Sequence, residues 1–198
     1  TWLELNNFHG VNILTNITKQ IDQKYDGVIN IKNINQKIDF NNYSILMKGS
    51  GLIDYLESII NQKQKISIDI KNCTNGILFL PLLYKANKNI KFLELSFRDS
   101  NKQVNIFQIN NFKIFFKIEE KNIKKNEIKI ILSNNKINKS SSSFEEILDE
   151  KIIQKNLSKS LKPKQKQWDI ISNIAERVFV PESEESRNLG AGGGDAND

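Results

Sequence analysis

The chain has 198 residues, a net charge of +6, and 38% hydrophobic and 26% charged residues, a composition typical of one globular domain or of a domain with a tail. Its longest apolar runs are far shorter than the roughly 20 residues that cross a bilayer as a helix, which excludes a transmembrane helix. The sequence has one cysteine, Cys73, and one histidine, His9. These counts exclude a disulfide framework and a zinc finger or ribbon.

The positive charge comes from lysine. Of the 29 basic residues 26 are Lys, and only Arg98, Arg177 and Arg187 are Arg. Proteins that read nucleic-acid sequence rely on arginine for bidentate contacts, and single-strand binders place exposed aromatic residues along a basic groove. Neither pattern is present in this sequence. The lysines are spread along the whole chain, which favours a solvated surface, and we therefore expect no nucleic-acid partner.

Apolar residues at helical spacing predict that the chain starts within the end of a helix, which Gly10 stops, and continues with a second helix that ends by Gly27. The asparagine-rich residues 28–42 are expected to form an irregular strand and loop. Because the sequence starts with Thr1, we expect a further segment before it. No secretory signal is visible, so we expect a cytoplasmic protein.

The next segments predict a strand, a helix and a second strand. Residues 43–47 are expected to form a short strand, and Ser50 to cap the helix that follows. That helix carries its apolar face at Leu52, Ile53, Leu56, Ile59 and Ile60. Over residues 66–71 isoleucine alternates with polar residues, which is the pattern of a half-buried strand. The run 77–84 is apolar, but Pro81 and its short length leave strand and helix both open.

Residues 90–132 contain four runs of apolar residues separated by turn residues, and they predict four strands joined by hairpins. The runs cover 93–97, 104–109, 112–118 and 128–132. Asn110-Asn111 suits a tight turn between the second and third runs, because asparagine tolerates a positive φ. Consecutive hairpins imply an antiparallel meander.

Two helices are expected after the strands. Ser143-Phe144-Glu145-Glu146 has the pattern of a capping box and predicts a helix through Phe144, Ile147, Leu148 and Ile152. A last helix is expected to begin near Pro163, because proline suits the first turn of a helix. Its apolar face is Trp168, Ile171, Ala175 and Val178.

This order of elements predicts an α+β fold, with an antiparallel-rich mixed sheet, helices at both ends of the chain, and the helices packed on one face of the sheet. We expect residues 1–179 to form a single domain and residues 180–198 to form a tail rich in glutamate and glycine. His9 is expected at a helix end, and Cys73 is expected to be a half-buried small residue rather than a reactive thiol. Two acidic pairs are expected at a strand end and at a helix start, in solvent: Glu119-Glu120 and Glu145-Glu146.

The tail differs in composition from the rest of the chain. It has no lysine and five acidic residues, and four of the nine glycines lie at 190–194. Successive glycines let backbone N–H groups point at one anion, and Arg187 adds positive charge. We predict that the tail binds a small anionic ligand or a partner protein, with no metal and an unknown cofactor. The predicted site residues are Glu184, Ser186, Arg187, Gly190, Gly192 and Asp195.

Several alternatives to this tail site stay open. A glycine-rich terminus can also be a flexible end without a binding role. An enzyme would use Glu184 or Glu185 as a general base beside Arg187 as an electrostatic stabiliser. A structural accessory subunit would use the tail to complete an oligomer, such as a homo-oligomer. Ser183 and Ser186 lack a nearby histidine in sequence, which disfavours a serine nucleophile.

The same tail carries a resemblance to a known family. The residues Val180-Pro181-Glu182-Ser183-Glu184-Glu185-Ser186-Arg187, then Gly190-Ala191-Gly192 and the closing Asp195, Asn197 and Asp198, resemble the terminal signature of an uncharacterised bacterial family, a domain of unknown function. Its members end in a Pro-Ala-Thr-Glu-x-Ser-Arg, Gly-Ala-Gly and Asp-Asn-Asp pattern. The segments Trp2-Leu3, His9-Gly10, Gly51 to Asp54 and Leu80-Pro81-Leu82 are similar to that family as well. The resemblance implies a preceding helical segment of a few tens of residues, and it implies no activity.

Overall fold

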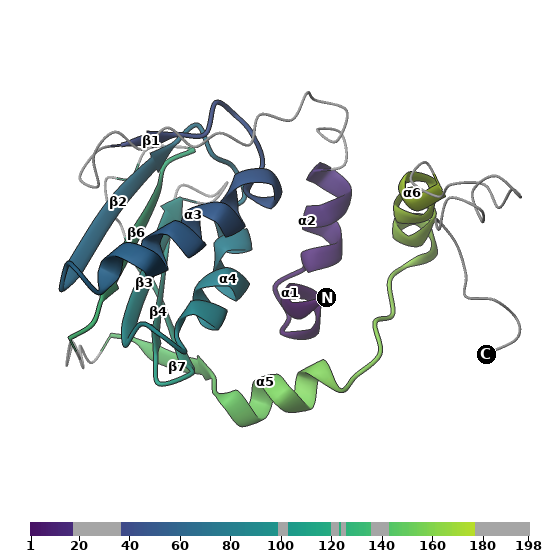
Figure 1. Cartoon of the computed structure of the whole chain (residues 1–198). Coiled ribbons are helices and arrows are strands. Elements are labelled where there is room, and N and C mark those ends of the chain that lie inside the picture. Colours follow the sequence, from purple (N-terminus) through teal and green to yellow (C-terminus); the bar gives the residue numbers. More distant parts are fainter. Residues whose placement is uncertain (18–36, 99–102, 120–122, 124–125, 136–142, 177–198) are drawn as a thin grey trace, which may run out of the picture.

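The computed structural model describes residues 1–17, 37–98, 103–119, 123, 126–135 and 143–176 (Figure 1). These residues form a seven-stranded sheet in the order β1-β2-β6-β3-β4-β5-β7. The β1–β2 pair is parallel, and the other pairs of this sheet are antiparallel. Helices α3 and α4 cover one face of the sheet in Figure 1. The predicted α+β class, with a mixed and mostly antiparallel sheet, is therefore confirmed.

The strands are β1 (Ile38–Asp39), β2 (Lys65–Lys71), β3 (Phe92–Arg98), β4 (Val104–Asn110), β5 (Lys113–Glu119), β6 (Ile128–Ser133) and β7 (Glu145–Leu148). The helices are α1 (Trp2–Leu5), α2 (Gly10–Ile17), α3 (Ile45–Ile60), α4 (Phe79–Ala86), α5 (Glu150–Leu157) and α6 (Gln165–Glu176), and the 3-10 turn η2 (Gly76–Leu78) leads into α4. No helix of the described residues is long and apolar enough to cross a membrane.

The core lies between the sheet and the two helices that cover it. Isoleucines of β2 pair with apolar residues of β6, as in Ile68 opposite Ile130, and both side chains are buried. Leu52 and Leu56 of α3 are buried against this layer. Full burial of such a side chain stabilises the fold by about 1.5–3 kcal/mol. The predicted alternation of β2 and the predicted apolar face of α3 are both confirmed.

Helix α3 begins earlier than predicted. Residues 43–47 do not form a strand, because the hydroxyl of Ser44 accepts a hydrogen bond from the backbone N–H of Leu46 at 3.2 Å and caps a helix that starts at Ile45. Ser50, the predicted cap, is exposed within the helix. The glycine beside it serves packing: a Cβ at Gly49 would lie 2.5 Å from Cγ2 of Ile45 and 3.2 Å from Cδ1 of Leu82 in α4.

The two serines give a test of this helix start. Ser44→Ala is expected to lower the free energy of unfolding by about 0.5–2 kcal/mol, because the helix loses its cap. Ser50→Ala is expected to change it by less than about 0.5 kcal/mol, since Ser50 is an exposed residue of a helix interior. Urea denaturation of both variants measures the difference. A larger loss for Ser50→Ala than for Ser44→Ala would place the helix start at the later serine.

The first helices also differ from the prediction at Gly10. Helix α1 ends at Leu5, and Gly10 is the first residue of α2 rather than a stop. A glycine is needed at this position because the chain passes close to α1: a Cβ at Gly10 would lie 2.8 Å from Cβ of Leu3. His9 was predicted at the end of the first helix, but it lies four residues after α1 ends, has a φ of 52° and directly precedes α2, so this prediction is wrong. The predicted end of the second helix near Gly27 lies outside the described residues.

The predicted meander is correct for three strands and wrong for the fourth. Strands β3, β4 and β5 are consecutive antiparallel neighbours, but β6 lies between β2 and β3. There it buries Ile128, Ile130 and Leu132 between two strands. The β4–β5 turn uses Asn111 and Phe112, one residue later than expected, with φ of 49° and 57°.

The predicted capping box forms a strand. Residues 145–148 pair with β5 as β7, where Leu148 lies opposite Ile114 and is buried. The acidic pair there stands at a strand start instead of a helix start, and Glu146 forms an ion pair of 2.9 Å with Lys113 across the strands. Helix α5 starts later, capped by Asp149, whose Oδ1 accepts from the N–H of Ile152 at 2.7 Å.

The apolar run 77–84, left open by the sequence, folds as η2 and the start of α4, with Pro81 in the first turn of the helix, where proline is tolerated. The last predicted helix is present as α6, but it starts two residues after Pro163, so the proline precedes the helix and does not lie in its first turn. Gln167 of α6 donates a hydrogen bond to Asn12 of α2. The predicted boundary after residue 179 lies outside the described residues.

Candidate functional site

The site predicted from the sequence lies outside the described residues. This holds for all six of its members: Glu184, Ser186, Arg187, Gly190, Gly192 and Asp195. The described residues instead line two neighbouring cavities. One lies where β2 and β3 end and β6 begins, and the other lies against β3, β4, β5, β7 and the turn between α1 and α2.

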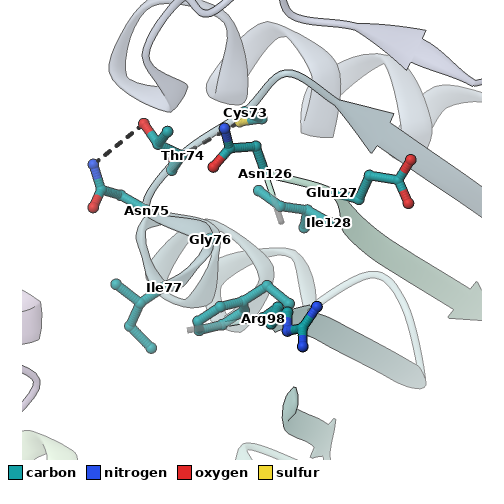
Figure 2. A pocket seen from close by; sticks show the side chains of 10 residues that line it. Cys73, Thr74, Asn75, Gly76, Ile77, Arg98, Asn126, Glu127 and Ile128 are labelled. Atoms are coloured by element: carbon teal, nitrogen blue, oxygen red, sulfur yellow. Dashed lines mark hydrogen bonds between the residues drawn. The ribbon is translucent and has the colours of Figure 1, made fainter. Parts of the chain in front are cut away.

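The first of these, which we name the polar cavity, has a volume of about 340 Å³ (Figure 2). It lies where β2 and β3 end and β6 begins, because both strands run antiparallel to β6 and so finish at the same edge. Its lining residues are Cys73, Thr74, Asn75, Gly76, Ile77, Phe97, Arg98, Asn126, Glu127 and Ile128.

Asparagines in the left-handed backbone conformation shape the polar cavity. Asn72, Asn75 and Asn126 have φ of 51°, 59° and 61°, a conformation that asparagine adopts more readily than most residues. The N–H of Cys73 donates to the carbonyl of Asn126 at 3.1 Å and joins the two loops. The wall of the cavity is therefore fixed by backbone conformation and by a backbone hydrogen bond.

The loop after β2 is also tied to β1. The side-chain amide of Asn72 donates to both carboxylate oxygens of Asp39, at 2.9 and 3.0 Å, and the N–H of Asn41 donates to Oδ1 at 2.8 Å. These hydrogen bonds, with that from Asn41 the strongest cause, hold the pKa of Asp39 below its usual value. The carboxylate is thus engaged in supporting the loop.

Arg98 supplies the positive charge of the polar cavity. It is the last residue of β3, half-buried, and its Nη1 donates to the carbonyl of Ile123 at 3.5 Å. The neighbouring Asn75 donates a hydrogen bond of 3.5 Å to the hydroxyl of Thr74. In Figure 2 the carboxylate of Glu127 points away from the guanidinium of Arg98. The lining of the cavity thus includes a guanidinium, two amides and a hydroxyl.

Gly76 allows the loop to lie directly on the ring of Phe97. A Cβ at this position would lie 2.5 Å from Cγ, 2.7 Å from Cβ and 2.8 Å from Cδ1 of Phe97. Such distances are shorter than any side-chain contact tolerates, so the floor of the polar cavity needs a glycine. Phe97 itself is held by Phe107, with the rings stacked 6.0 Å apart.

The side chain of Cys73 forms part of the wall of the polar cavity. Burial raises its pKa to about 12, and the side chain is 1% exposed, so it is more deeply buried than predicted. Cys73 is therefore protonated at neutral pH, and only the deprotonated thiolate is a good nucleophile. Burial, with smaller effects of Glu150 and Asp149, likewise raises the pKa of Tyr84. Neither shift brings a group toward neutral pH.

The state of Cys73 can be checked by alkylation. At about pH 8 we expect iodoacetamide to react with folded protein at least roughly 100-fold more slowly than with protein unfolded in urea, because burial suppresses the thiolate. A raised pKa also means that the protonated thiol stabilises the fold. This contribution is fully present below the ordinary value of 9.0 and is lost as the pH rises toward about 12. Equal alkylation rates for folded and unfolded protein would contradict the burial of Cys73.

The second cavity, which we name the phenylalanine cavity, has a volume of about 300 Å³. Its apolar lining residues are Phe8, Ile77, Phe97, Phe107, Phe116 and Ile147, and its polar ones are Asn7, His9 and Asn105. The ring of Phe107 is the centre of this group, with ring centroids 4.8 Å from Phe116 and 5.9 Å from Phe8. Ile77 and Phe97 line both cavities.

A third recess lies between α3 and the turn after α4. It is lined by Asp54, Glu57, Ser58, Ile60, Asn61, Lys88 and Asn89. The amide of Asn89 donates to Glu57 at 3.4 Å. Among the described residues no group of three or more His, Cys, Asp or Glu side chains could hold a metal ion. The recess is a mixed-charge surface, and it serves below as a reference region.

The sequence contained one signal for the polar cavity that the prediction did not use. Arg98 was noted only as a rare arginine, yet it ends one strand, and Asn75-Gly76 lies in the loop that follows another strand. Both features place polar groups at strand ends, where loops commonly carry binding residues. Their meeting at one edge depends on the insertion of β6, which the sequence did not predict.

Comparisons with known proteins do not extend this picture. No protein-family model, no curated protein and no solved structure matches the chain. The resemblance to an uncharacterised bacterial family therefore stays a prediction, and function has to be inferred from the geometry of the cavities.

Proposed function

We propose that the chain is a binding protein for a small anionic ligand, and that the polar cavity holds the anion. The observation that carries the proposal is the guanidinium of Arg98 at a cavity of about 340 Å³ that is also lined by Asn75 and Asn126. A guanidinium matches carboxylate and phosphate oxygens with parallel N–H groups. The side-chain amides of Asn75 and Asn126 add further hydrogen-bond donors.

The chemistry of the lining favours binding over catalysis. Of the described residues that line the polar cavity, Glu127 is the one carboxylate and Cys73 the one thiol, and burial keeps the thiol protonated. A nucleophile needs a base or a lowered pKa, and the raised pKa of Cys73 is the opposite. The enzyme alternative, with Glu184 or Glu185 as a base, concerns the tail and stays a prediction.

The test compares Arg98→Gln with the unchanged chain in thermal melting against inorganic phosphate and acetate. We expect the anions to raise the melting temperature of the unchanged chain by preferential binding to the folded state. Arg98→Gln should weaken binding by roughly 10- to 100-fold, because a hydrogen bond to a charged group contributes about 1.5–3 kcal/mol. Lys88→Gln, at the exposed reference recess, removes the same charge and should keep the response.

If the anion binds at the tail site predicted from the sequence, the same measurement should give a different result. If Arg187 holds the anion, Arg187→Gln loses the response and Arg98→Gln keeps it. If the polar cavity holds the anion, the two variants behave in the opposite way. A response that survives in both variants would overturn both versions of the proposal. The absence of a nucleic-acid partner and the cytoplasmic location remain predictions from the sequence.

A further inference from the structure

The phenylalanine cavity lies at an end of the sheet where the apolar face is only partly covered. Along β3 and β5 this face is fully buried at Leu95 and Ile114, and it is only half-buried two residues later, at Phe97 and Phe116. Both strands run antiparallel to β4, so these two phenylalanines lie at the same end of the sheet. The cavity of about 300 Å³ is found there.

This cavity lies on the face of the sheet opposite the side chain of Arg98. Neighbouring residues of a strand point to opposite faces, and Phe97 and Arg98 are neighbours in β3. Asn105 lies opposite Phe97 in the pairing of β3 with β4 and so shares its face, as does Phe107 two residues further along. A ligand in the phenylalanine cavity therefore lies apart from the guanidinium and needs no negative charge.

Asn105 is a polar residue on this otherwise apolar face of β4. It is half-buried, lines the cavity, and lies between Phe97 of β3 and Ile118 of β5. Within the described part of the chain its amide has no hydrogen-bond partner. Gln108, on the opposite face, has one and donates to Glu94 at 2.8 Å. An amide offers a donor and an acceptor side by side, so Asn105 is suited to a ligand that offers the same pair.

The turn between α1 and α2 closes the cavity with one more aromatic ring. Phe8 stands between Asn7 and His9, whose φ values are 66° and 52°, and its N–H donates to the carbonyl of Leu3 at 2.8 Å. Its ring packs edge-on against Phe107, with the centroids 5.9 Å apart. The cavity thus has aromatic walls and a few polar side chains, which is the usual composition of a small-molecule site.

We propose that the phenylalanine cavity is a second binding site, which takes a neutral aromatic ligand that carries an amide or a similar donor–acceptor group. The ring packs among Phe97, Phe107 and Phe116, because aromatic rings favour edge and offset contacts with one another. The polar group of the ligand exchanges hydrogen bonds with the amide of Asn105. A cavity of about 150 Å³ already holds benzene, so about 300 Å³ admits a ring with such a substituent.

The experiment titrates the full chain with benzamide and with toluene, which has the ring without the amide, and measures both affinities by calorimetry. Asn105→Leu should weaken benzamide binding by roughly 2- to 10-fold, as expected for the loss of a neutral hydrogen bond, and should not weaken toluene binding. Ile147→Trp, which fills the cavity from β7, should abolish the binding of both. The matched control is Asn89→Leu at the reference recess, which should bind both compounds as the unchanged chain does.

Amide chemical shifts of the unchanged chain give a second measurement that needs no variant. Benzamide should perturb the amides of Phe8, Asn105 and Phe116. No binding of benzamide, perturbation that spares these three amides, or equal benzamide affinity in Asn105→Leu and the unchanged chain would overturn the inference.

The two proposed sites fail separately. Phosphate binding should be unchanged in Asn105→Leu, and benzamide binding should be unchanged in Arg98→Gln. A phosphate response that survives in Arg98→Gln, with benzamide binding as expected here, would overturn the anion site and support the aromatic site alone.

Discussion

Phe107→Ala is expected to lower the free energy of unfolding by about 3–5 kcal/mol, the usual cost of removing a buried phenylalanine ring. Phe107 is 4% exposed on β4, and its ring contacts those of Phe8, Phe97 and Phe116. Removing it leaves a void among three aromatic neighbours that are held by different elements and cannot all move inward. Guanidinium denaturation with an unchanged slope would measure the loss.

The matched control for Phe107 is Phe115 on the neighbouring strand. Phe115 lies opposite Gln108, which places it on the other face of the sheet, and it is half-buried. Its truncation to alanine should cost nearer about 1 kcal/mol. If the two variants lose equal stability, Phe107 is not the centre of an aromatic core, and the phenylalanine cavity would have no rigid wall.

Gly76→Ala is expected to destabilise the fold by about 1–3 kcal/mol, the cost of forcing an extra group into a packed site. The new Cβ would lie 2.5 Å from Cγ of Phe97, so the ring or the loop has to move. The ring of Phe107, stacked with that of Phe97 at 6.0 Å, restricts this movement. Since Phe97 lines both cavities, the same movement should weaken anion binding. Thermal melting with and without phosphate measures both effects.

Gly51→Ala provides the opposite expectation in the same chain. Nothing lies within 4 Å of the position that its Cβ would take, and Gly51 is an exposed residue in the interior of α3. Alanine there should raise the free energy of unfolding by about 0.5–1 kcal/mol, because it restricts the unfolded chain and favours helix. A Gly76→Ala variant as stable as the unchanged chain would contradict the contact between the loop and Phe97.

Strands were predictable wherever local patterning and burial agreed. The alternation over β2, β3 and β6 reports one face turned to the core, and this depends only on neighbouring residues. The position of β6 was not predictable in this way, because it depends on pairing with β2 across about sixty residues of chain. The hairpin rule applies only to strands that follow each other in the sequence. It therefore does not predict that β6 pairs with β3 on the side away from β4.

Helix boundaries failed where packing overrode local signals. Residues 43–47 were predicted as a strand before a helix capped by Ser50, yet α3 already starts at Ile45, and Gly49 within it lets the helix approach Leu82 of α4. The capping-box pattern of residues 143–146 favours a helix locally, but pairing with β5 and the ion pair from Lys113 to Glu146 hold it as a strand. Tertiary contacts determine whether such segments form a helix or a strand, and these contacts cannot be deduced from the local sequence.

The candidate site was only partly readable for the same reason. Its polar groups come from the loop after β2, the end of β3 and the start of β6, which are separate in sequence and meet only in the sheet. The anionic class of ligand was predicted from Arg187 and the glycines of the tail, and it is proposed again here from Arg98. The two proposals share a ligand class and differ in location.

The central claim is therefore where the anion binds, and the most direct test is to follow amide chemical shifts in a ¹⁵N-labelled sample titrated with inorganic phosphate. The account predicts that the perturbed amides cluster at Thr74, Gly76, Arg98 and Asn126, with Asp54 and Lys88 of the reference recess unchanged. Perturbation confined to the tail around Arg187, or an unperturbed spectrum at a concentration that saturates thermal stabilisation, would contradict it.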